Sequence, residues 1–353
     1  AYLEGPDMRT NLEWLNKGIH VTTSDDTPIT LYTSNTNKYS YDASVIYPVS
    51  SLYKEYVVQT YPTDDQATEF AVVSAADDNL IEVKIKQTYY DIVTNKIDSI
   101  RYKVFSITLD KGQSYLYRTD EGTTSLTGST ICATQPVSFF QGGQLAAVLG
   151  GRTPSSHIYN HVPASDAWGK NYIVTRTAQQ DYDVAAFIAA EQNTKIYRDN
   201  ILLVTLNPQE SYLDTIYWKD YPDNAIYYHS SRAMGCHVFE TGKEMNTSAY
   251  GSPTVADIPP LEQSIQRTIF AGFKYRYMPL KEYSIAEHYV NIVLPTSIKS
   301  SMMVDDNVVA AELFTDIRTL VNGIAYSHAC VKVSEGSHIL KNINGGFVAH
   351  AYG

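Results

Sequence analysis

Short runs of alternating apolar and polar residues dominate the chain, and Gly, Pro, Asn and Asp residues separate these runs. The apolar positions are rich in β-branched and aromatic residues, while the spacing of an amphipathic helix is nearly absent. A period of two places every second side chain on one face of an extended strand. The clearest runs are Tyr56–Thr60, Phe70–Ala75, Leu80–Ile85, Tyr102–Leu109, Ser114–Arg118 and Val137–Gln141. The pattern predicts an all-β protein built from short antiparallel strands.

A recurring phrase shows that the predicted strands belong to a repeating unit. LDKGQSYL at 109–116 returns as LNPQESYL at 206–213 and, more faintly, as VSEGSHIL at 333–340. A pair of predicted strands precedes each copy, and another predicted strand follows it. The spacing therefore predicts three units of about 100 residues, each with about seven strands.

The strand count of each unit favours a sandwich. A propeller blade needs four strands in about 40–45 residues, whereas seven strands per hundred residues suit two packed sheets. We expect tandem antiparallel β-sandwich-like repeats, with a β-propeller as the alternative. The predicted boundaries are 1–50 for an incomplete N-terminal β unit and 51–145, 146–250 and 251–353 for the three repeats.

The N-terminal segment resembles only the end of a unit. Pro28–Tyr32 (PITLY) matches the closing strand Pro136–Phe140 (PVSFF) of the first repeat, but the strands that should precede it are missing. Either the chain is a processed or truncated form, or this half unit completes its sheet with strands from elsewhere, such as another molecule, because unpaired strand edges accept added strands.

Composition narrows the classes of partner. The chain has 29 Tyr against 10 Phe and 3 Trp, and tyrosine favours half-exposed sheet surfaces and contact surfaces. A net charge of −11 gives no attraction to nucleic acid or to anionic lipid. No stretch reaches the roughly 20 apolar residues of a membrane span, and the first ten residues lack the regions of a signal peptide. We expect a secreted chain whose signal has been removed, with neither nucleic acid nor membrane as its partner.

Three cysteines and one sequon bear on the compartment. Cys132, Cys236 and Cys330 fit neither a zinc site nor a dense disulfide framework, and one disulfide would leave a thiol free to pair between chains. The tripeptide that begins at Asn246 predicts glycosylation if the chain passes through a eukaryotic secretory pathway.

Candidate catalytic chemistry is sparse. The sequence contains no nucleophile elbow, phosphate-binding loop, dinucleotide fingerprint or HExxH motif, so we expect no enzyme. No cofactor is expected either, although paired carboxylates suit Ca²⁺ or a glycosidase. Turn chemistry is the favoured interpretation of these pairs. The acidic pairs are Asp25-Asp26, Asp64-Asp65, Asp77-Asp78 and Asp305-Asp306. His157 and His161 have the spacing of helical metal ligands, but Pro163 favours a polar loop there.

Aromatic residues are the best candidates for a binding surface. Trp168, followed by Gly169, predicts either a structural corner, which is favoured, or an exposed platform for a sugar ring. The cluster Tyr275, Arg276 and Tyr277 combines the residue types that are enriched in interface hot spots. Sheet packing and partner contact are equally compatible with this cluster.

Four phrases in order resemble the N-terminal domain family of IgGFc-binding proteins, which occurs in animal mucus proteins and secreted bacterial proteins. They are GIHVTTSDDTPITLY at 18–32, SLTGSTICATQPVSFFQG at 125–142, SHIYNHVPASDAWGKNYIV at 156–174 and GSPTVADIPPLEQ at 251–263. The resemblance covers about residues 17–353 and implies extracellular adhesion or scaffolding, without established catalytic residues. Family members usually carry strands before the first phrase, and this chain lacks them.

The resemblance and the repeats together predict an extracellular, non-enzymatic module that contacts glycoproteins, glycans or itself. A filament or matrix subunit assembled by strand exchange between copies is the first alternative. A carbohydrate-active enzyme that uses an acidic pair is the second.

Overall fold

The structure is a computed structural model that describes residues 14–25, 27–37, 40–63, 66–91, 94, 96–120, 122–149, 155–247, 251–272, 285 and 287–353. Antiparallel sheets account for nearly all of its regular structure, which confirms the all-β prediction. Short 3-10 segments connect some of the strands. Their bounds are η1 Val49–Ser51, η2 Ser165–Ala167, η3 Trp218–Asp220, η4 Lys243–Met245, η5 Leu261–Gln263, η7 Thr296–Ser301 and η8 Ala311–Leu313.

The first unit is a sandwich of two five-stranded sheets. One sheet has the order β1-β8-β5-β11-β12, and the other has the order β4-β10-β6-β7 with β9 beside β6. The strands are β1 Trp14–Leu15, β4 Glu55–Val57, β5 Thr68–Ser74, β6 Asn79–Tyr90, β7 Ile97–Leu109, β8 Ser114–Arg118, β9 Thr124–Ser125, β10 Thr130–Ala133, β11 Val137–Ala146 and β12 Ser156–His161.

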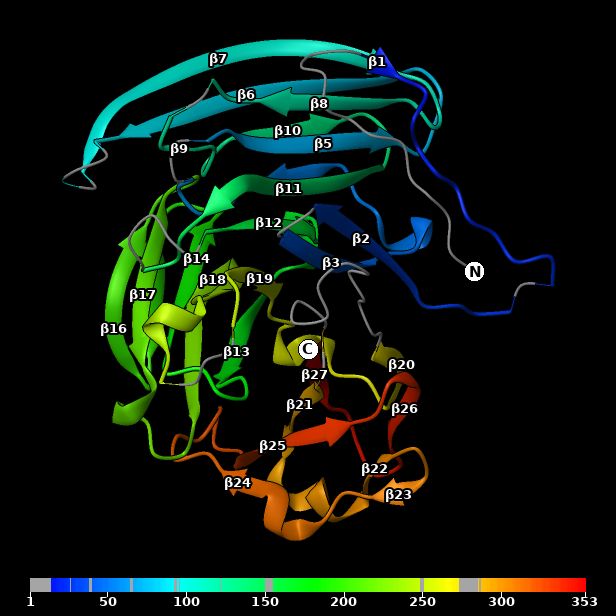
Figure 1. The fold of residues 1–353 in the computed structure, drawn as a ribbon, viewed down its shortest axis with the longest axis vertical. Coiled ribbons are helices and arrows are strands. Elements are labelled where there is room, and N and C mark those ends of the chain that lie inside the picture. The colour runs from blue at the N-terminus through cyan, green and yellow to red at the C-terminus, as the bar shows by residue number, and fades with distance from the viewer. Residues whose placement is uncertain are drawn as a thin grey trace.

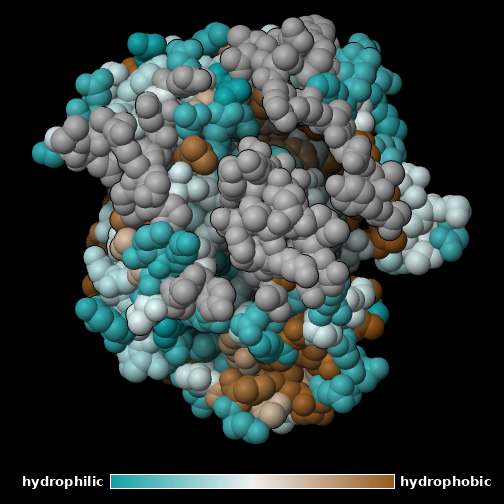
Figure 2. Space-filling view, viewed as in Figure 1, coloured by the Kyte–Doolittle hydropathy of each residue, from teal (hydrophilic) through white to brown (hydrophobic). Residues whose placement is uncertain are grey.

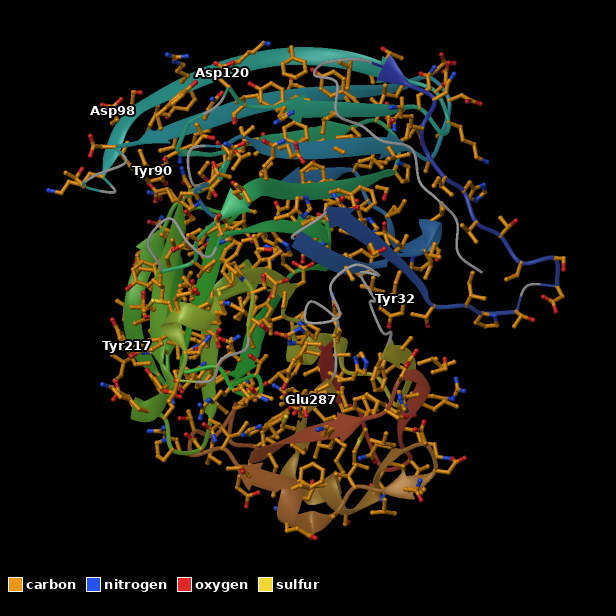
Figure 3. All side chains as sticks on the ribbon, in the orientation of Figure 1. Tyr32, Tyr90, Asp98, Asp120, Tyr217 and Glu287 are labelled. Carbon is orange, nitrogen blue, oxygen red and sulfur yellow. The ribbon has the colours of Figure 1, made fainter. Side chains whose placement is uncertain are left out.

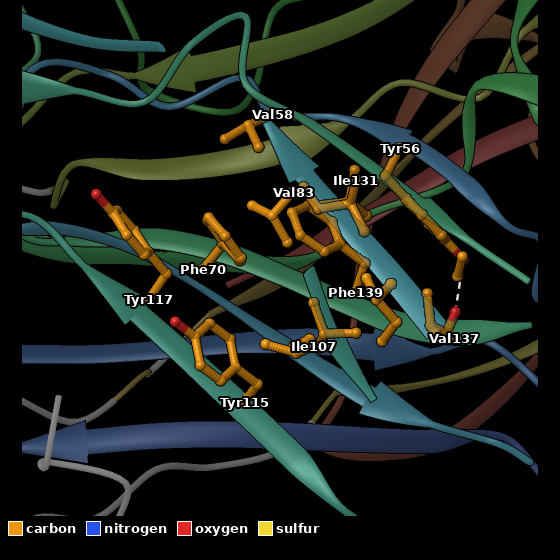
Figure 4. Packing of buried hydrophobic residues seen from close by; sticks show 14 of the residues in the cluster. Tyr56, Val58, Phe70, Val83, Ile107, Tyr115, Tyr117, Ile131, Val137 and Phe139 are labelled. Atoms are coloured by element: carbon orange, nitrogen blue, oxygen red, sulfur yellow. Dashed lines mark hydrogen bonds between the residues drawn. The ribbon is translucent and has the colours of Figure 1, made fainter. Parts of the chain in front are cut away.

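Alternation along these strands builds the core of the first sandwich. Every second residue of β5 is buried, and the first seven residues of β6 alternate between buried and exposed. Phe70 and Phe139 from one sheet meet Tyr56 from the other, with ring centroids 5.2 Å apart for Tyr56 and Phe139. The Tyr56 hydroxyl donates a 2.7 Å hydrogen bond to the carbonyl of Val137, so its one polar atom is satisfied inside the core (Figure 4).

The second unit wraps one seven-stranded sheet around its own core. Its strands are β13 Gly169–Thr175, β14 Tyr182–Ala189, β15 Thr194–Arg198, β16 Ile201–Leu206, β17 Ser211–Tyr217, β18 Ala225–Glu240 and β19 Thr254–Asp257. The first half of β18 pairs with β13 and β15, and its second half pairs with β14 and β19. The 16-residue β18 thus runs through both layers, and Phe187, Trp218 and Tyr228 fill the space between them.

The third unit again has two sheets, with the orders β20-β26-β22-β23 and β24-β25-β21-β27. Its strands are β20 Arg267–Gly272, β21 His288–Pro295, β22 Met302–Val304, β23 Asn307–Val308, β24 Phe314–Asp316, β25 Tyr326–Val333, β26 Gly336–Asn342 and β27 Val348–Tyr352. Phe270, Ile292, Met302 and Phe347 lie in the core between the sheets.

The three units share one order of pairing. In the first unit β5 pairs with β8 and β11, while β6 pairs with β7 and β10. In the second, β14 pairs with β17 and β18, while β15 pairs with β16 and β18. In the third, β21 pairs with β25 and β27, while β22 pairs with β23 and β26. The strands β7, β16 and β23 are therefore equivalent, and each lies at the edge of its unit.

The recurring phrase occupies equivalent turns in the first two units only. The backbone N–H of Asp110 bonds the side chain of Gln113, and that of Asn207 bonds the side chain of Glu210. Both turns connect the edge strand, β7 or β16, to the strand after it. The faint third copy at 333–340 instead spans the turn between β25 and β26. It resembles the other two because all three are tight turns between strands.

Two apolar junctions hold the units together. Ile158 and Ala146 of the first unit pack with Val184 and Phe239 of the second. A second cluster joins the second unit to the third and includes Tyr227 and Val293. The first unit lies at the top of Figure 1, the second at the left and the third at the bottom.

The N-terminal segment forms its own two-stranded hairpin, β2 Leu31–Asn37 with β3 Ser40–Ile46. β3 packs against β12, and the Thr30 hydroxyl donates to the carbonyl of Ile269 on β20, so the segment bridges the first and third units. β12 lies beyond the predicted boundary at 145, yet it pairs with β11 in the first sheet. The other domain boundaries stay predictions.

Candidate interaction surface

The third unit has an open groove at one edge of its sandwich. The groove has a volume of about 320 Å³. Apolar side chains form its floor, and Asp305, Lys332, Ser334 and His338 contribute polar groups. The apolar residues are Val304, Val308, Val309, Ala310, Leu313, Val331 and Val333. Val304, Val331 and Val333 also border the core of this unit, so the groove is the uncovered margin of that core.

The groove exists because the edge strand of the third unit is short. In the first unit the 13-residue β7 turns Ile107 and Leu109 into the core. In the second, β16 contributes Leu206. β23 has only two residues, and both are exposed. The third sandwich therefore receives one inward side chain at this position, that of Val309 directly after β23, and none from β23 itself.

The acidic pair Asp305-Asp306 forms the turn beside this groove. Both residues have left-handed backbone angles, with φ of 51° and 65°, as a tight hairpin turn requires. Asp305 Oδ2 lies 2.6 Å from His338 Nδ1, and the opposite ring nitrogen lies 2.7 Å from the carbonyl oxygen of Ser334. Burial opposes a charge on His338, but these two acceptors raise the pKa of its imidazole overall. The hydrogen bond from His338 lowers the pKa of Asp305.

The edge strand β7 presents a second exposed surface. Tyr102 is 73% exposed and Val104 is 64% exposed, and both lie on the face that also carries Ile100. The neighbouring positions Arg101 and Lys103 lie on the other face, where their cations sit over the rings of Tyr89 and Phe105. β7 forms the upper rim of the molecule, and Asp98 lies toward the outer end of its hairpin (Figure 3).

The sequence-predicted surface residues have different placements. Trp168 is partly buried, and its indole lies over Gly235, where an added Cβ would come within 3.0 Å of the ring. Gly169 is packed even more closely against Pro260. Trp168 therefore occupies a corner between β13 and β18. Tyr275, Arg276 and Tyr277 lie outside the described residues.

Asn246, the predicted glycosylation site, has its side-chain amide engaged within the protein. The amide nitrogen donates to Gln180 Oε1 at 2.6 Å and to the carbonyl of Gly242 at 3.0 Å, and the amide oxygen accepts from the backbone of Asp181. A glycan would replace one hydrogen of that nitrogen and so remove one of these bonds. Ser248, which completes the sequon, lies outside the described part of the chain.

Two further expectations can be compared with the structure. His157 and His161 lie on strand β12, not in a loop, because the alternation of SHIYNH continues the sheet up to Val162. His161 is buried and lies 2.9 Å from the hydroxyl of Ser138, and burial lowers the pKa of its imidazole to about 4. Cys132, Cys236 and Cys330 are all free thiols.

A cluster of ionisable groups lies buried where the N-terminal hairpin meets the second unit. Asp42 on β3 accepts a hydrogen bond from the Thr254 hydroxyl and lies 3.5 Å from His157. Burial and the nearby Asp42 raise the pKa of Glu240 to about 7. His237 contacts Asp257 across the β18–β19 ladder. The cluster thus joins β3 of the N-terminal hairpin, β12 of the first unit, and β18 and β19 of the second unit.

Within the described ranges, no three His, Cys, Asp or Glu side chains converge as metal ligands. Calcium binding stays a prediction. No helix in the same ranges has the length and apolar character needed to cross a bilayer.

The predicted surface residues include neither the groove nor the β7 edge, although the acidic pair Asp305-Asp306 borders the groove. The apolar run Val308–Ala311, which Asn307 separates from that pair, suits a strand and does not reveal the groove.

Comparison with known proteins places the chain in a family. The family model described as IgGFc binding protein matches residues 42–353. A human protein named IgGFc-binding protein is 25% identical over 318 residues, which are 89% of this chain but only 5% of the human protein. No solved structure matches. The family match extends over most of the chain and confirms the resemblance noted in the sequence: the chain belongs to the IgGFc-binding protein family.

Proposed function

We propose that this chain is an extracellular, non-enzymatic binding module that contacts glycoproteins through the groove at the open edge of its third unit. Family membership supports a binding role, and the name of the human relative gives one ligand class, the Fc region of IgG. The chain spans only 5% of that relative, so its own ligand is part of the proposal.

The groove carries the proposal. Apolar floor residues with a few polar groups at the rim are the usual lining of a recognition site. The exposed apolar side chains Val308 and Leu313, which are 60% and 45% exposed, are available to a partner. An extended segment of a glycoprotein would add a strand beside β23 and cover these side chains.

Binding to immobilised IgG Fc and to a mucin-type glycoprotein, measured by surface plasmon resonance, tests the proposal. We expect the chain to bind at least one of them and the Val308→Lys variant to bind it about tenfold more weakly or worse, because a lysine ammonium would be desolvated in the groove. Ile201→Lys is the matched control, since Ile201 is 71% exposed on the equivalent strand β16. Equal binding by wild type and Val308→Lys, or no binding to either ligand, contradicts the proposal.

A further inference from the structure

We propose that β7 of one copy pairs with the open edge of the third unit of a second copy, so that the chain assembles head to tail. The inference rests on the proposed function, because it assigns a second copy of the chain as a partner of the same groove.

The three units themselves indicate what kind of element is missing. β7, β16 and β23 are equivalent strands, and both residues of β23 are exposed, so that only Val309, which follows β23 and bonds Met302, reaches the core there. An added antiparallel strand beside β23 would supply inward side chains over Val331 and Val333. The groove therefore fits an extended strand with apolar residues at alternate positions.

β7 has the required pattern and a free edge. It is the last strand in the order β4-β10-β6-β7, and among the described residues its outer edge pairs with no strand. Ile100, Tyr102 and Val104 alternate along it and are 38%, 73% and 64% exposed. These three side chains would face the apolar floor of the groove when β7 adds to β23.

Charge disfavours the pairing of two copies of β7 with each other. The segment 305–316, which borders the groove, contains four carboxylates and no Lys or Arg, and three of these carboxylates, those of Asp305, Asp306 and Asp316, contact His338, Lys341 and Lys299 within the molecule. β7 carries Arg101 and Lys103 between its apolar positions. Two copies of β7 paired with each other through Tyr102 would instead place Arg101 opposite Lys103, and like charges directly opposite each other destabilise a sheet. Charge thus favours the pairing of β7 with the groove over the pairing of β7 with itself.

The two surfaces lie at opposite ends of the molecule. β7 forms the top of Figure 1, and β23 lies near the bottom. Figure 2, which shows the molecule from the same side, has an exposed apolar patch in its lower part. One copy cannot join its own two ends. A contact between different surfaces of two copies leaves one free surface on each partner, so it adds further molecules until the rotation closes a ring, or without limit where it does not close.

Sedimentation velocity over a range of concentrations tests this assembly. We expect wild type to form species that grow with concentration, and Tyr102→Lys and Val308→Lys each to remain monomeric. A mixture of the two variants should form dimers and nothing larger, because the first retains the groove and the second retains β7. Ile201→Lys should assemble like wild type. Circular dichroism checks that the exposed substitutions leave the fold intact.

Several outcomes overturn the inference. They are a wild type that is monomeric at every concentration, a Tyr102→Lys or Val308→Lys chain that assembles like wild type, and a mixture of the two that stays monomeric.

Glycoprotein binding separates the two proposals. Tyr102→Lys should retain it and Val308→Lys should lose it. A monomeric wild type that binds glycoprotein removes only the assembly, whereas an assembling chain that binds neither glycoprotein removes only the proposed ligand.

Discussion

Asp183 on β14 lies directly opposite Glu240 on β18, and both carboxyl groups are buried. The Trp218 indole donates a 2.6 Å hydrogen bond to Asp183, whereas Glu240 Oε1 has no hydrogen-bond partner. Burial, with each carboxylate near another acid, raises the pKa values of both groups. Two carboxylates in these positions disfavour ionisation of each other, so the pair prefers the protonated form.

The stability contributed by Glu240 should therefore depend on pH. Its pKa is about 7 in the folded protein and near 4.5 when unperturbed, so the folded state favours the protonated form. Stability from this group is fully present below pH 4.5 and is lost as the pH rises through 7, by at most about 3 kcal/mol. Glu240→Gln removes the ionisation, so its stability relative to wild type should rise across this window.

Urea unfolding of both proteins between pH 4.5 and 8 measures this difference. The buried His161, whose pKa is lowered to about 4, has the opposite effect, because its contribution is lost as the pH falls from 6.5 toward 4. That contribution is common to both proteins and cancels in the difference. Parallel stability curves for wild type and Glu240→Gln would show that Glu240 titrates normally.

Arg318 forms a fork with Asp223 that ties the third unit to the second. Its Nε and one terminal nitrogen lie 3.1 and 2.6 Å from Asp223 Oδ1, and its backbone N–H donates to Oδ2. Lysine cannot make this planar contact, so Arg318→Lys should lower the free energy of unfolding by about 1 kcal/mol. Arg232→Lys is the control, because its pair with Glu191 is exposed. Urea unfolding measures both losses in free energy. Equal losses for the two substitutions would show that the Arg318–Asp223 fork stabilises the protein no more than an exposed ion pair does.

The fold was predictable from the sequence where the signal was local. Alternation in Phe70–Ala75 and Leu80–Ile85 marks β5 and β6 because burial of every second side chain leaves a period of two in the sequence. The same signal runs through β12, although the nearby Pro163 favours a loop for His157 and His161. A proline beyond the last paired residue does not prevent a strand from ending just before it.

The groove was not predictable, because it depends on what a strand lacks in comparison with its equivalents. The sequence after Asp306 contains apolar residues that suit a strand, but β23 ends at Val308. Where a strand ends depends on pairing with residues distant in the sequence, and a single sequence does not contain that information. The passage of β18 through both layers was missed for the same reason, since its two halves pair with different strands.

The hydroxyl of Tyr56 should contribute measurably to the stability of the first unit. It donates to the carbonyl of Val137 at 2.7 Å in a site where Tyr56 is 2% exposed. Tyr56→Phe keeps the ring in the core and removes this bond together with the 3.4 Å bond that the same oxygen accepts from the backbone N–H of Tyr53, so the free energy of unfolding should fall by about 1 kcal/mol. Tyr102→Phe makes the same change on a side chain that is 73% exposed and should have no measurable effect on the monomer.

A close contact at Gly142 gives a larger expected effect. A Cβ at this position on β11 would lie 2.2 Å from the backbone carbonyl oxygen of Ile158 on β12. A clash with backbone cannot be relieved by a side-chain rotation, so Gly142→Ala should separate the two strands and lower the free energy of unfolding by about 3 kcal/mol. Gly112→Ala meets no atom within 4 Å and should cost only about 1 kcal/mol, from its left-handed backbone at φ 82°. Because Ile158 also packs against Val184 and Phe239, loss of β12 should loosen the junction of the first two units. Hydrogen exchange of the β11 and β12 amides in Gly142→Ala checks this, and unchanged protection there would place the cost of the substitution elsewhere.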